Sequence, residues 1–286
     1  MAEQLKAVIT QGGDSISLGS GGDFGLLEYE GFEASEYTIS FDSNAQLDGG
    51  TVAGKKVEPR PIKLVGEYLR SDKSDRMRQR LIKLFNPKKT GELMVSFGNI
   101  SRKIQYEVEA FKVDEQNIFR PLRFTANLIC PSPYWMDTET FAKNMAGVRK
   151  LLAFPFIIPK QRGAVMSYRE MQQEAVIVNK GNREVGLNVT FEAKRGSVLN
   201  PALYNLSKNQ YLRMELEMKE GDVLTICTIP GKKRVEWNGA NAIQYIDRGS
   251  VFFGIAPGET VIKYDADENK QNLDVYPRYT PEYLGV

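Results

Sequence analysis

The chain has no histidine, only two cysteines and no long apolar run, and each absence excludes a class of function. Without histidine it cannot supply a Ser-His-Asp triad, a Cys-His pair, an HExxH metal site or a histidine general base. Cys130 and Cys227 are nearly a hundred positions apart and form no CxxC pair, so we expect buried, unbridged thiols made in a reducing cytoplasm. The most apolar run, residues 151–158, contains Pro155 and is far shorter than the ~20 residues of a membrane-spanning helix, so we expect no membrane insertion.

The composition is that of an ordinary globular protein. Of 286 residues, 42% are hydrophobic and 26% are charged, and the formal net charge is +2. At about 150 residues per domain this length predicts two domains, each large enough to form its own core.

The first part of the chain, residues 1–137, is dominated by short segments in which apolar and polar residues alternate, as in strands with one buried face. The alternating apolar residues are Tyr37, Ile39 and Phe41; Leu93, Val95 and Phe97; and Tyr106, Val108 and Ala110. Apolar residues at helical spacing predict one helix near 73–86, which Asn86-Pro87 ends. We therefore expect an N-terminal β domain with a single helix.

The middle and the end of the chain differ in pattern. Phe141, Met145, Val148 and Leu152 are spaced as on one face of a helix, which predicts a helix over 138–152 within a helical linker region over 138–160. Residues 161–286 again show alternating strands separated by turns such as Pro230-Gly231, which predicts an antiparallel β-sandwich.

No set of residues indicates catalysis, a bound metal or a cofactor. The many carboxylates are expected on the surface, although a glycosidase-like pair depends on a spatial separation that the sequence does not give. Trp237, at the end of a strand before Asn238-Gly239, has two interpretations. It is either a platform for a sugar ring or, as we favour, a cap on the core or a subunit contact.

Charge is unevenly distributed near the N-terminus. Residues 7–54 contain eight acids and no Lys or Arg, whereas residues 55–89 contain twelve bases and four acids. A segment of net charge −8 is thus followed by one of net charge +8. The two segments either pair within one domain or place opposite charges on two sides of a protomer, so that copies join head to tail.

The amino-acid sequences of several segments resemble those of the distal tail proteins of siphophages. The segments are the stretch from Asp48-Gly49-Gly50 to Pro61-Ile62, Leu84-Phe85-Asn86-Pro87, Arg102-Lys103-Ile104, Cys130-Pro131-Ser132-Pro133-Tyr134-Trp135, Asn179-Lys180-Gly181-Asn182, Gly196 to Pro201, Gly221-Asp222 and Tyr283-Leu284-Gly285-Val286. The resemblance rests on the order and spacing of these segments, and it covers nearly the whole chain.

This resemblance implies a mainly β protein with two sandwich-type domains: an N-terminal domain that forms a ring of six copies, and a C-terminal galectin-like or carbohydrate-module-like sandwich. It implies a structural virion component at the distal end of the tail, made in the host cytoplasm. The implied partners are copies of itself, the tail tube protein, the tail-associated hub protein and receptor-binding or other baseplate proteins. Duplex DNA passes through such a ring, so we expect no tight DNA binding. The galactoside site of true galectins uses a histidine, which this chain lacks.

Within the two oppositely charged segments we expect contacts between ring subunits. The residues concerned are Glu30, Glu33, Glu58, Arg60, Arg76 and Arg80. The alternative function is a carbohydrate-binding adhesin whose C-terminal sandwich reads host cell-wall sugars through Trp237 and nearby Tyr residues, and a glycoside hydrolase ranks last.

Overall fold

The computed structural model describes residues 5–43, 48–70, 74–114, 121–142, 144–145, 148–150, 167–169 and 174–286. The chain divides into two compact units. Unit 1 comprises Met1–Thr138 together with Glu282–Val286, and unit 2 comprises Glu139–Pro281. Unit 2 is therefore inserted into the sequence of unit 1, just before its last five residues.

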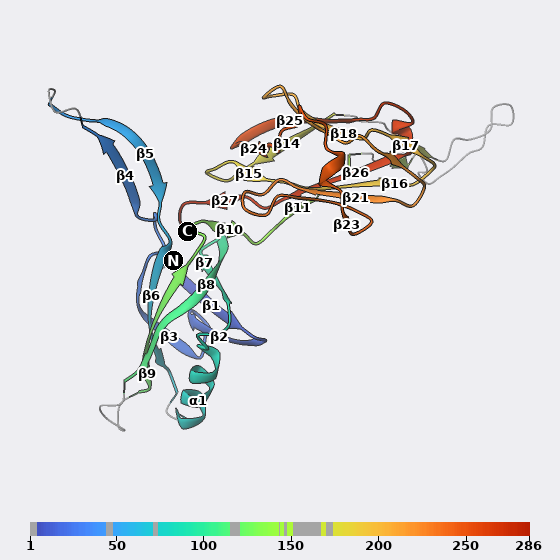
Figure 1. The fold of residues 1–286 in the computed structure, drawn as a ribbon. Helices are drawn as coiled ribbons and strands as arrows, with labels where there is room; N and C mark the ends of the chain where they lie inside the picture. The colour runs from blue at the N-terminus through green and yellow to red at the C-terminus, as the bar shows by residue number, and fades with distance from the viewer. Residues whose placement is uncertain are drawn as a thin grey trace. The chain divides into compact units, whose positions relative to one another are not determined.

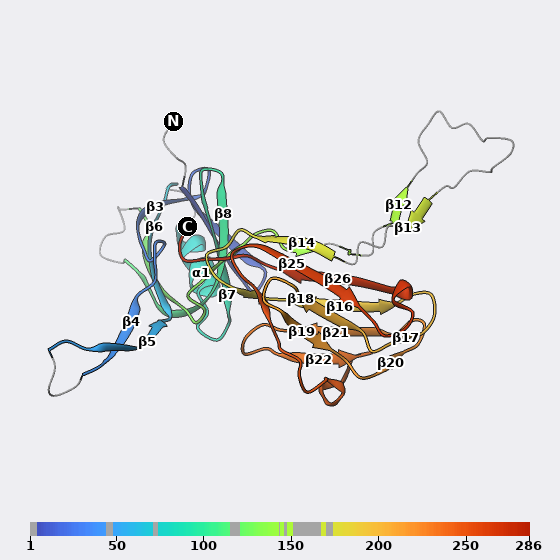
Figure 2. The same ribbon diagram turned by 90° about the horizontal axis from the view of Figure 1, so that it is seen from above.

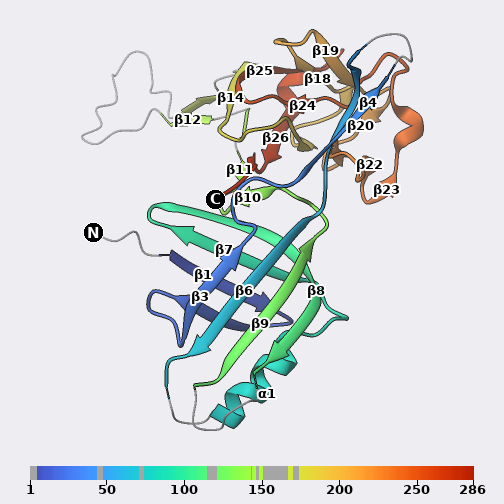
Figure 3. The same cartoon turned by 90° about the vertical axis from the view of Figure 1, so that its left-hand side faces the viewer.

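Unit 1 is built on one antiparallel-rich sheet that closes on itself (Figure 3). Its strands are β1 (Leu5–Gln11), β2 (Asp14–Gly19), β3 (Phe24–Glu30), β6 (Arg60–Tyr68), β7 (Gly91–Phe97), β8 (Ile100–Val113), β9 (Arg123–Cys130), β10 (Trp135–Asp137) and β27 (Glu282–Tyr283). The long strand β8 pairs with β7 along one part and with β9 along another, with a register shift between Val108 and Ala110. This irregularity bends the strand, so seven strands close as a barrel rather than as an open sandwich. The mainly β prediction is confirmed.

The predicted helix is present as α1 (Ser74–Leu84). Leu81, Leu84 and Phe85 are buried in the core of unit 1, and Met77 packs against that core. The apolar spacing noted in the sequence therefore marks the face that closes one end of the barrel (Figure 3).

The strands β4 (Tyr37–Asp42) and β5 (Thr51–Val57) form a hairpin that is separate from the barrel sheet. It projects from the end of unit 1 opposite α1 (Figure 1 and Figure 3). All six residues of β4 are exposed, so the expectation that Tyr37, Ile39 and Phe41 form a buried face is wrong for the protomer. The alternation is real, but the barrel offers this hairpin no surface against which to pack.

Unit 2 is a two-layer sandwich (Figure 1). Its larger sheet contains β11 (Phe141–Ala142), β26 (Leu273–Tyr279), β16 (Asn188–Ala193), β21 (Val223–Cys227), β22 (Arg234–Trp237) and β23 (Ala240–Asn241), and its smaller sheet contains β14 (Glu174–Asn179), β25 (Gly258–Asp265), β18 (Ala202–Asn205) and β19 (Gln210–Arg213). Figure 2 shows the strands β26, β16 and β21 of the larger sheet side by side. The predicted alternations are confirmed, since Leu187, Val189, Phe191, Leu212 and Met214 are all buried in the core between the layers.

Short elements complete unit 2. They are β12 (Val148–Lys150), β13 (Ser167–Arg169), β15 (Val185–Gly186), β17 (Val198–Leu199), β20 (Glu217–Met218), β24 (Gly254–Ile255) and the 3-10 turns η1 (Ile243–Tyr245) and η2 (Lys270–Asn272).

The predicted helix over 138–152 is wrong. Phe141 lies in β11 opposite Tyr279, and the Met145 amide donates to the Val275 carbonyl at 2.9 Å. Phe141 and Met145 are held by these contacts with β26, and such tertiary contacts override a local helical pattern. Leu152 lies outside the described residues.

Candidate assembly surface

The β4–β5 hairpin has one apolar and one polar face. Residues directly opposite one another across a strand pair share a face, and Tyr37 lies opposite Val57 while Phe41 lies opposite Val52. Ile39 lies between them on β4, opposite Lys55 and before a register shift between Ser40 and Phe41, whereas Thr38 and Ser40 lie on the other face. The apolar stripe is open to solvent: Tyr37 is 52%, Ile39 47%, Phe41 62% and Val52 46% exposed. The hairpin therefore has the pattern of a strand pair with one buried face, but its protomer buries neither.

About half of the acidic segment pairs with the basic segment inside unit 1. Two ion pairs, Lys83–Asp14 at 3.0 Å and Arg70–Asp23 at 3.3 Å, join the two segments near α1 and the end of β6. Lys63 on β6 lies 3.2 Å from Glu28 and 3.1 Å from Glu30 on β3. The intramolecular interpretation of the charge reversal is thus correct for these four acids, and Glu30 is engaged within its own protomer.

The other four acids of the segment form no ion pair among the described residues. They are Glu33, Glu36, Asp42 and Asp48. Glu33 and Glu36 line a groove of about 450 Å³ at the base of the hairpin, together with Glu30, Glu109 and Lys63. The groove carries four carboxylates, the ammonium of Lys63 and the buried guanidinium of Arg60, so its lining has a net charge of −2. It is therefore an acidic surface at the hairpin end of the barrel.

The basic side chains of α1 lie at the other end of unit 1. Strand β6 has nine residues, about 26 Å at ~3.3 Å per step, and it runs from the hairpin end to the helix end. Arg76 is exposed on α1. Arg80 donates to the Ser15 carbonyl at 2.7 Å and is only partly exposed. The two ends of the barrel thus keep opposite charge after the internal pairs have formed.

Arg60 does not lie on the surface. Its side chain is 1% exposed, and its guanidinium donates to the carbonyls of Gly31 at 2.7 Å, Glu33 at 2.5 Å and Pro133 at 2.9 Å, and also to that of Leu284. The expectation that Arg60 contacts a neighbouring subunit is therefore wrong for this protomer, because every direction of its planar fork is occupied. Burial lowers the pKa of the guanidinium, which nevertheless stays protonated at any physiological pH.

The last residues of the chain are held by Arg60 and Arg102. Arg102 donates to the Gly285 carbonyl, and its guanidinium lies 3.6 Å from the centre of the Tyr283 ring. Tyr283 also pairs with Trp135 across β10 and β27. Glu282–Val286 is consequently an integral part of unit 1.

Glu58, at the base of the hairpin, is paired locally. Its carboxylate accepts from Lys56 at 2.9 Å and from Thr38 at 3.0 Å, and the Lys56 hydrogen bond is the main reason that its pKa lies below the usual value. Lys56 and Thr38 lie opposite each other on the polar face of the hairpin. Glu58 therefore fixes the base of the hairpin and leaves the apolar face unobstructed.

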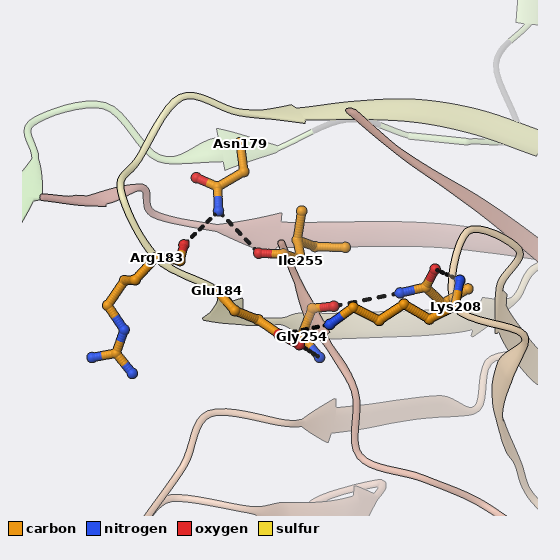
Figure 4. Close-up of polar contacts among 7 residues, drawn as sticks. Asn179, Arg183, Glu184, Lys208, Gly254 and Ile255 are labelled. Atoms are coloured by element: carbon orange, nitrogen blue, oxygen red, sulfur yellow. Dashed lines mark hydrogen bonds and ion pairs between the residues drawn. The ribbon is translucent and has the colours of Figure 1, made fainter. Parts of the chain in front are cut away.

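The Asn179–Asn182 segment, which carries part of the family resemblance, has a structural role in unit 2 (Figure 4). The buried Asn179 amide donates to the carbonyls of Arg183 and Ile255, both at 2.9 Å, and its oxygen accepts from the Gly181 amide. Next to it Glu184 accepts from Lys208 at 2.6 Å and from the Gly254 amide at 3.2 Å. These bonds fix the turn between β14 and β15 against β24.

Trp237 packs as part of unit 2. Its ring is partly buried against the core and meets Tyr245 edge to face, with ring centres 5.9 Å apart. This is the placement of a residue that covers a core, although a ligand role for Trp237 stays a prediction.

Three further features concern metal ligands, membrane spans and thiols. No cluster of three or more potential metal ligands occurs in the part of the chain that the structure describes, and no helix there is long and apolar enough to cross a membrane. Both cysteines are buried and free, as predicted, and burial raises the pKa of the Cys130 thiol to about 12.

A closed barrel with a hairpin outside its sheet, joined in sequence to a two-layer sandwich, defines a mainly β protein of two units. Residues 180–283 match the family of the siphovirus-type tail component, C-terminal domain. The sandwich unit therefore matches this family over most of its length, and the resemblance stated from the sequence is confirmed.

Solved structures share the whole two-unit fold. The chain is similar to the Dit protein of phage SPP1, with a TM-score of 0.65 and 12% identity over 97% of this chain and 99% of that one. The SPP1 protein is described as a paradigm of the hub adsorption apparatus in phages that infect Gram-positive bacteria. The chain is also similar to a chain of the phage P2 baseplate in its activated conformation with Ca, with a TM-score of 0.50 and 9% identity over 97% and 98% of the two chains. None of the curated proteins matches.

Sequence reasoning missed two groups of residues. The sequence did not predict that the hairpin's apolar face is exposed. Period-two alternation indicates that a strand has an apolar face but not which surface covers it. A polar pocket on unit 2, formed by Tyr204, Tyr211, Arg213, Glu215 and Asp247, was also missed. Its one available signal is the pair of tyrosines that flank the turn at Asn209, a residue with positive φ.

Proposed function

We propose that this chain is the subunit of a ring of six copies at the distal end of a phage tail, where the ring joins the tail tube to the adsorption apparatus. The observation that carries the proposal is the β4–β5 hairpin, whose apolar face has no partner in its own protomer. The tail-component family of unit 2 and the hub role described for the similar SPP1 protein support it.

Burial of the hairpin stripe would stabilise an assembly appreciably. Tyr37, Ile39, Phe41 and Val52 are each about half exposed. Covering the exposed half contributes on the order of 1 kcal/mol per side chain, or about 4 kcal/mol for the stripe. A two-stranded hairpin is only marginally stable in water by itself, so a neighbouring surface also fixes its conformation.

The charge distribution favours a contact between two different ends of neighbouring copies. Unpaired acids lie at the hairpin end and exposed bases lie on α1 at the other end, so the surface of one copy complements a different surface of the next. A contact of this heterologous type forms a closed ring when its rotation permits. Glu33, Glu36, Arg76 and Arg80 are the residues that we propose to contribute across this interface.

The oligomeric mass of the purified chain, measured by light scattering with negative-stain images, tests the proposal. We expect a ring that Phe41→Asp reduces to monomers. Ser40→Asp is the matched control, because it adds the same charge to the neighbouring residue on the polar face of the same strand and should leave the ring intact. Equal assembly of both variants would contradict the role of the apolar face.

A charge-reversal series tests the direction of the contact. Glu33→Lys with Glu36→Lys should weaken the ring, more so at low salt than at high salt, because exposed charges are screened. Adding Arg76→Glu and Arg80→Glu to that variant should restore it. Failure of the combined variant to recover would rule out this pairing while leaving the hairpin result in place.

The ring's other contacts follow from the same role. We propose that the barrel unit meets the tail tube protein, that the sandwich unit carries the tail-associated hub protein and receptor-binding or other baseplate proteins, and that the ring lets duplex DNA pass without tight binding. No residue in the described structure favours a catalytic function. The packing of Trp237 does not favour the adhesin alternative at that residue.

A further inference from the structure

The outer face of the smaller sheet of unit 2 carries a shallow pocket of about 250 Å³. It is lined by two aromatic rings, a guanidinium and two carboxylates: Tyr204, Tyr211, Arg213, Glu215 and Asp247. The volume lies just below the ~300–1,000 Å³ of sites for drug-sized ligands, so it suits one ring-sized molecule. None of these residues has a place in the ring proposed above.

The two tyrosines come from neighbouring strands. Tyr204 on β18 lies directly opposite Tyr211 on β19, and their ring centres are 6.1 Å apart with planes inclined by 34°. Both side chains are partly exposed, while Leu203 and Leu212 beside them point into the core. The rings thus form an aromatic surface on a rigid hairpin.

The polar groups around the rings are held in place before any ligand arrives. Asp247 accepts through Oδ2 from the Tyr211 hydroxyl at 2.9 Å and from the Gly249 amide at 3.0 Å. A Cβ at Gly249 would lie 2.2 Å from the Tyr211 hydroxyl, so only glycine permits this approach. The hydrogen bond to Asp247 is the main cause that raises the pKa of Tyr211, which therefore stays a donor.

Arg213 is fixed in the same way. Its guanidinium lies 2.5 Å from Asp267, which also accepts from Asn200 at 2.8 Å, and its amide donates to the Ser250 hydroxyl at 2.9 Å. Asp247 Oδ1 accepts no hydrogen bond from the described residues. The pocket therefore presents an aromatic surface, a free carboxylate oxygen and the unused hydrogens of an anchored guanidinium.

We infer that this pocket is a binding site for a neutral saccharide unit, a hexose or an N-acetylhexosamine. An aromatic face packs against the apolar C–H face of a sugar ring. The carboxylate oxygen and the guanidinium provide an acceptor and donors for neighbouring hydroxyls. With one positive and two negative lining residues the pocket disfavours anionic ligands such as polyol phosphates, which agrees with an uncharged sugar. Trp237 has no part in this site.

The test is saturation-transfer NMR and calorimetry on the full chain with a panel of neutral hexoses and N-acetylhexosamines. A single sugar has few atoms, so we expect a dissociation constant in the low millimolar range for at least one of them. Tyr204→Ala should weaken binding about tenfold or more, and Asp247→Asn by a similar factor. Tyr204→Phe keeps the ring and should bind like the original protein.

Two controls keep the outcome interpretable. Trp237→Phe preserves the packing on the core and should leave sugar binding unchanged, and the thermal midpoint of each variant shows whether unit 2 still folds. The inference is overturned if no sugar in the panel binds saturably, if Tyr204→Ala and Asp247→Asn bind normally while folded, or if only Trp237→Phe abolishes binding. Because ring assembly is measured separately by mass, either proposal can fail alone.

Discussion

Replacement of Arg60 by methionine should destabilise unit 1 strongly although no charged partner is lost. The guanidinium serves the carbonyls of Gly31, Glu33, Pro133 and Leu284, and among these the Pro133 carbonyl also accepts from Ser35 at 3.2 Å. Methionine has a similar length but donates nothing, so the partly buried carbonyls of Gly31, Glu33 and Leu284 would lose the hydrogen bonds that Arg60 provides.

The expected loss in the free energy of unfolding follows from the number of carbonyls that lose a hydrogen bond. Each buried acceptor left without a donor costs about 1–3 kcal/mol, whereas removal of a desolvated charge and entry of water offset part of the sum. We expect a loss of about 3–5 kcal/mol in the free energy of unfolding of unit 1. Arg60→Lys keeps the charge but replaces the planar fork by a single point, so about half of that loss should remain.

Urea unfolding measured by tryptophan fluorescence can report on unit 1 alone. The chain has two tryptophans, and Trp135 is buried in unit 1 with its ring centre 5.8 Å from the Arg60 guanidinium carbon. In a Trp237→Phe background all indole fluorescence comes from Trp135. Arg76→Met on the exposed face of α1 is the control and should change stability by no more than about 0.5 kcal/mol. A loss below about 1 kcal/mol for Arg60→Met would refute the reasoning.

Two further predictions concern unit 1. Gly91→Ala should lower its stability by about 2–3 kcal/mol in the same urea assay, because the new Cβ would lie 2.2 Å from Cζ of the fully buried Tyr106, whereas Gly54→Ala, with open space around it, should change little. The hydrogen bond and charge of Lys83 hold the pKa of Asp14 below 3.8, so the pair's contribution to stability is present above that pH and is lost as the pH falls through the folded-state pKa. NMR titration should show this low pKa, and Lys83→Met should return it toward 3.8; an unchanged pKa in that variant would argue against the pair.

Local patterns predicted the elements that bury an apolar face within their own unit. The helix α1 and the inward residues of β16 and β19 follow directly from spacing, because the core lies on one side of each. The helix expected over 138–152 failed for the opposite reason. Met145 bonds to β26, which lies more than a hundred residues away in sequence, and nothing near Met145 signals that partner.

The surface residues were harder to predict than the fold. Arg60 stands in a basic segment, and its burial depends on carbonyls supplied by Gly31, Pro133 and Leu284, which the sequence separates widely. The sequence showed that unit 1 has an acidic and a basic segment, but it did not show which acids form ion pairs within the unit. Those pairs depend on the register between β3 and β6. The saccharide pocket depends on a loop at Asp247 returning to β19, which no local pattern encodes.

The placement of Glu282–Val286 in unit 1 sets the order in which the two units mature on the ribosome. When residues up to Thr138 have emerged, the barrel still lacks strand β27 and the Leu284 and Gly285 carbonyls that Arg60 and Arg102 require. The sandwich, by contrast, has all of its strands once Pro281 is free, so it can finish folding first. A nascent or prematurely terminated chain therefore cannot present a finished barrel, and subunits would enter an assembly only after translation has passed the sandwich.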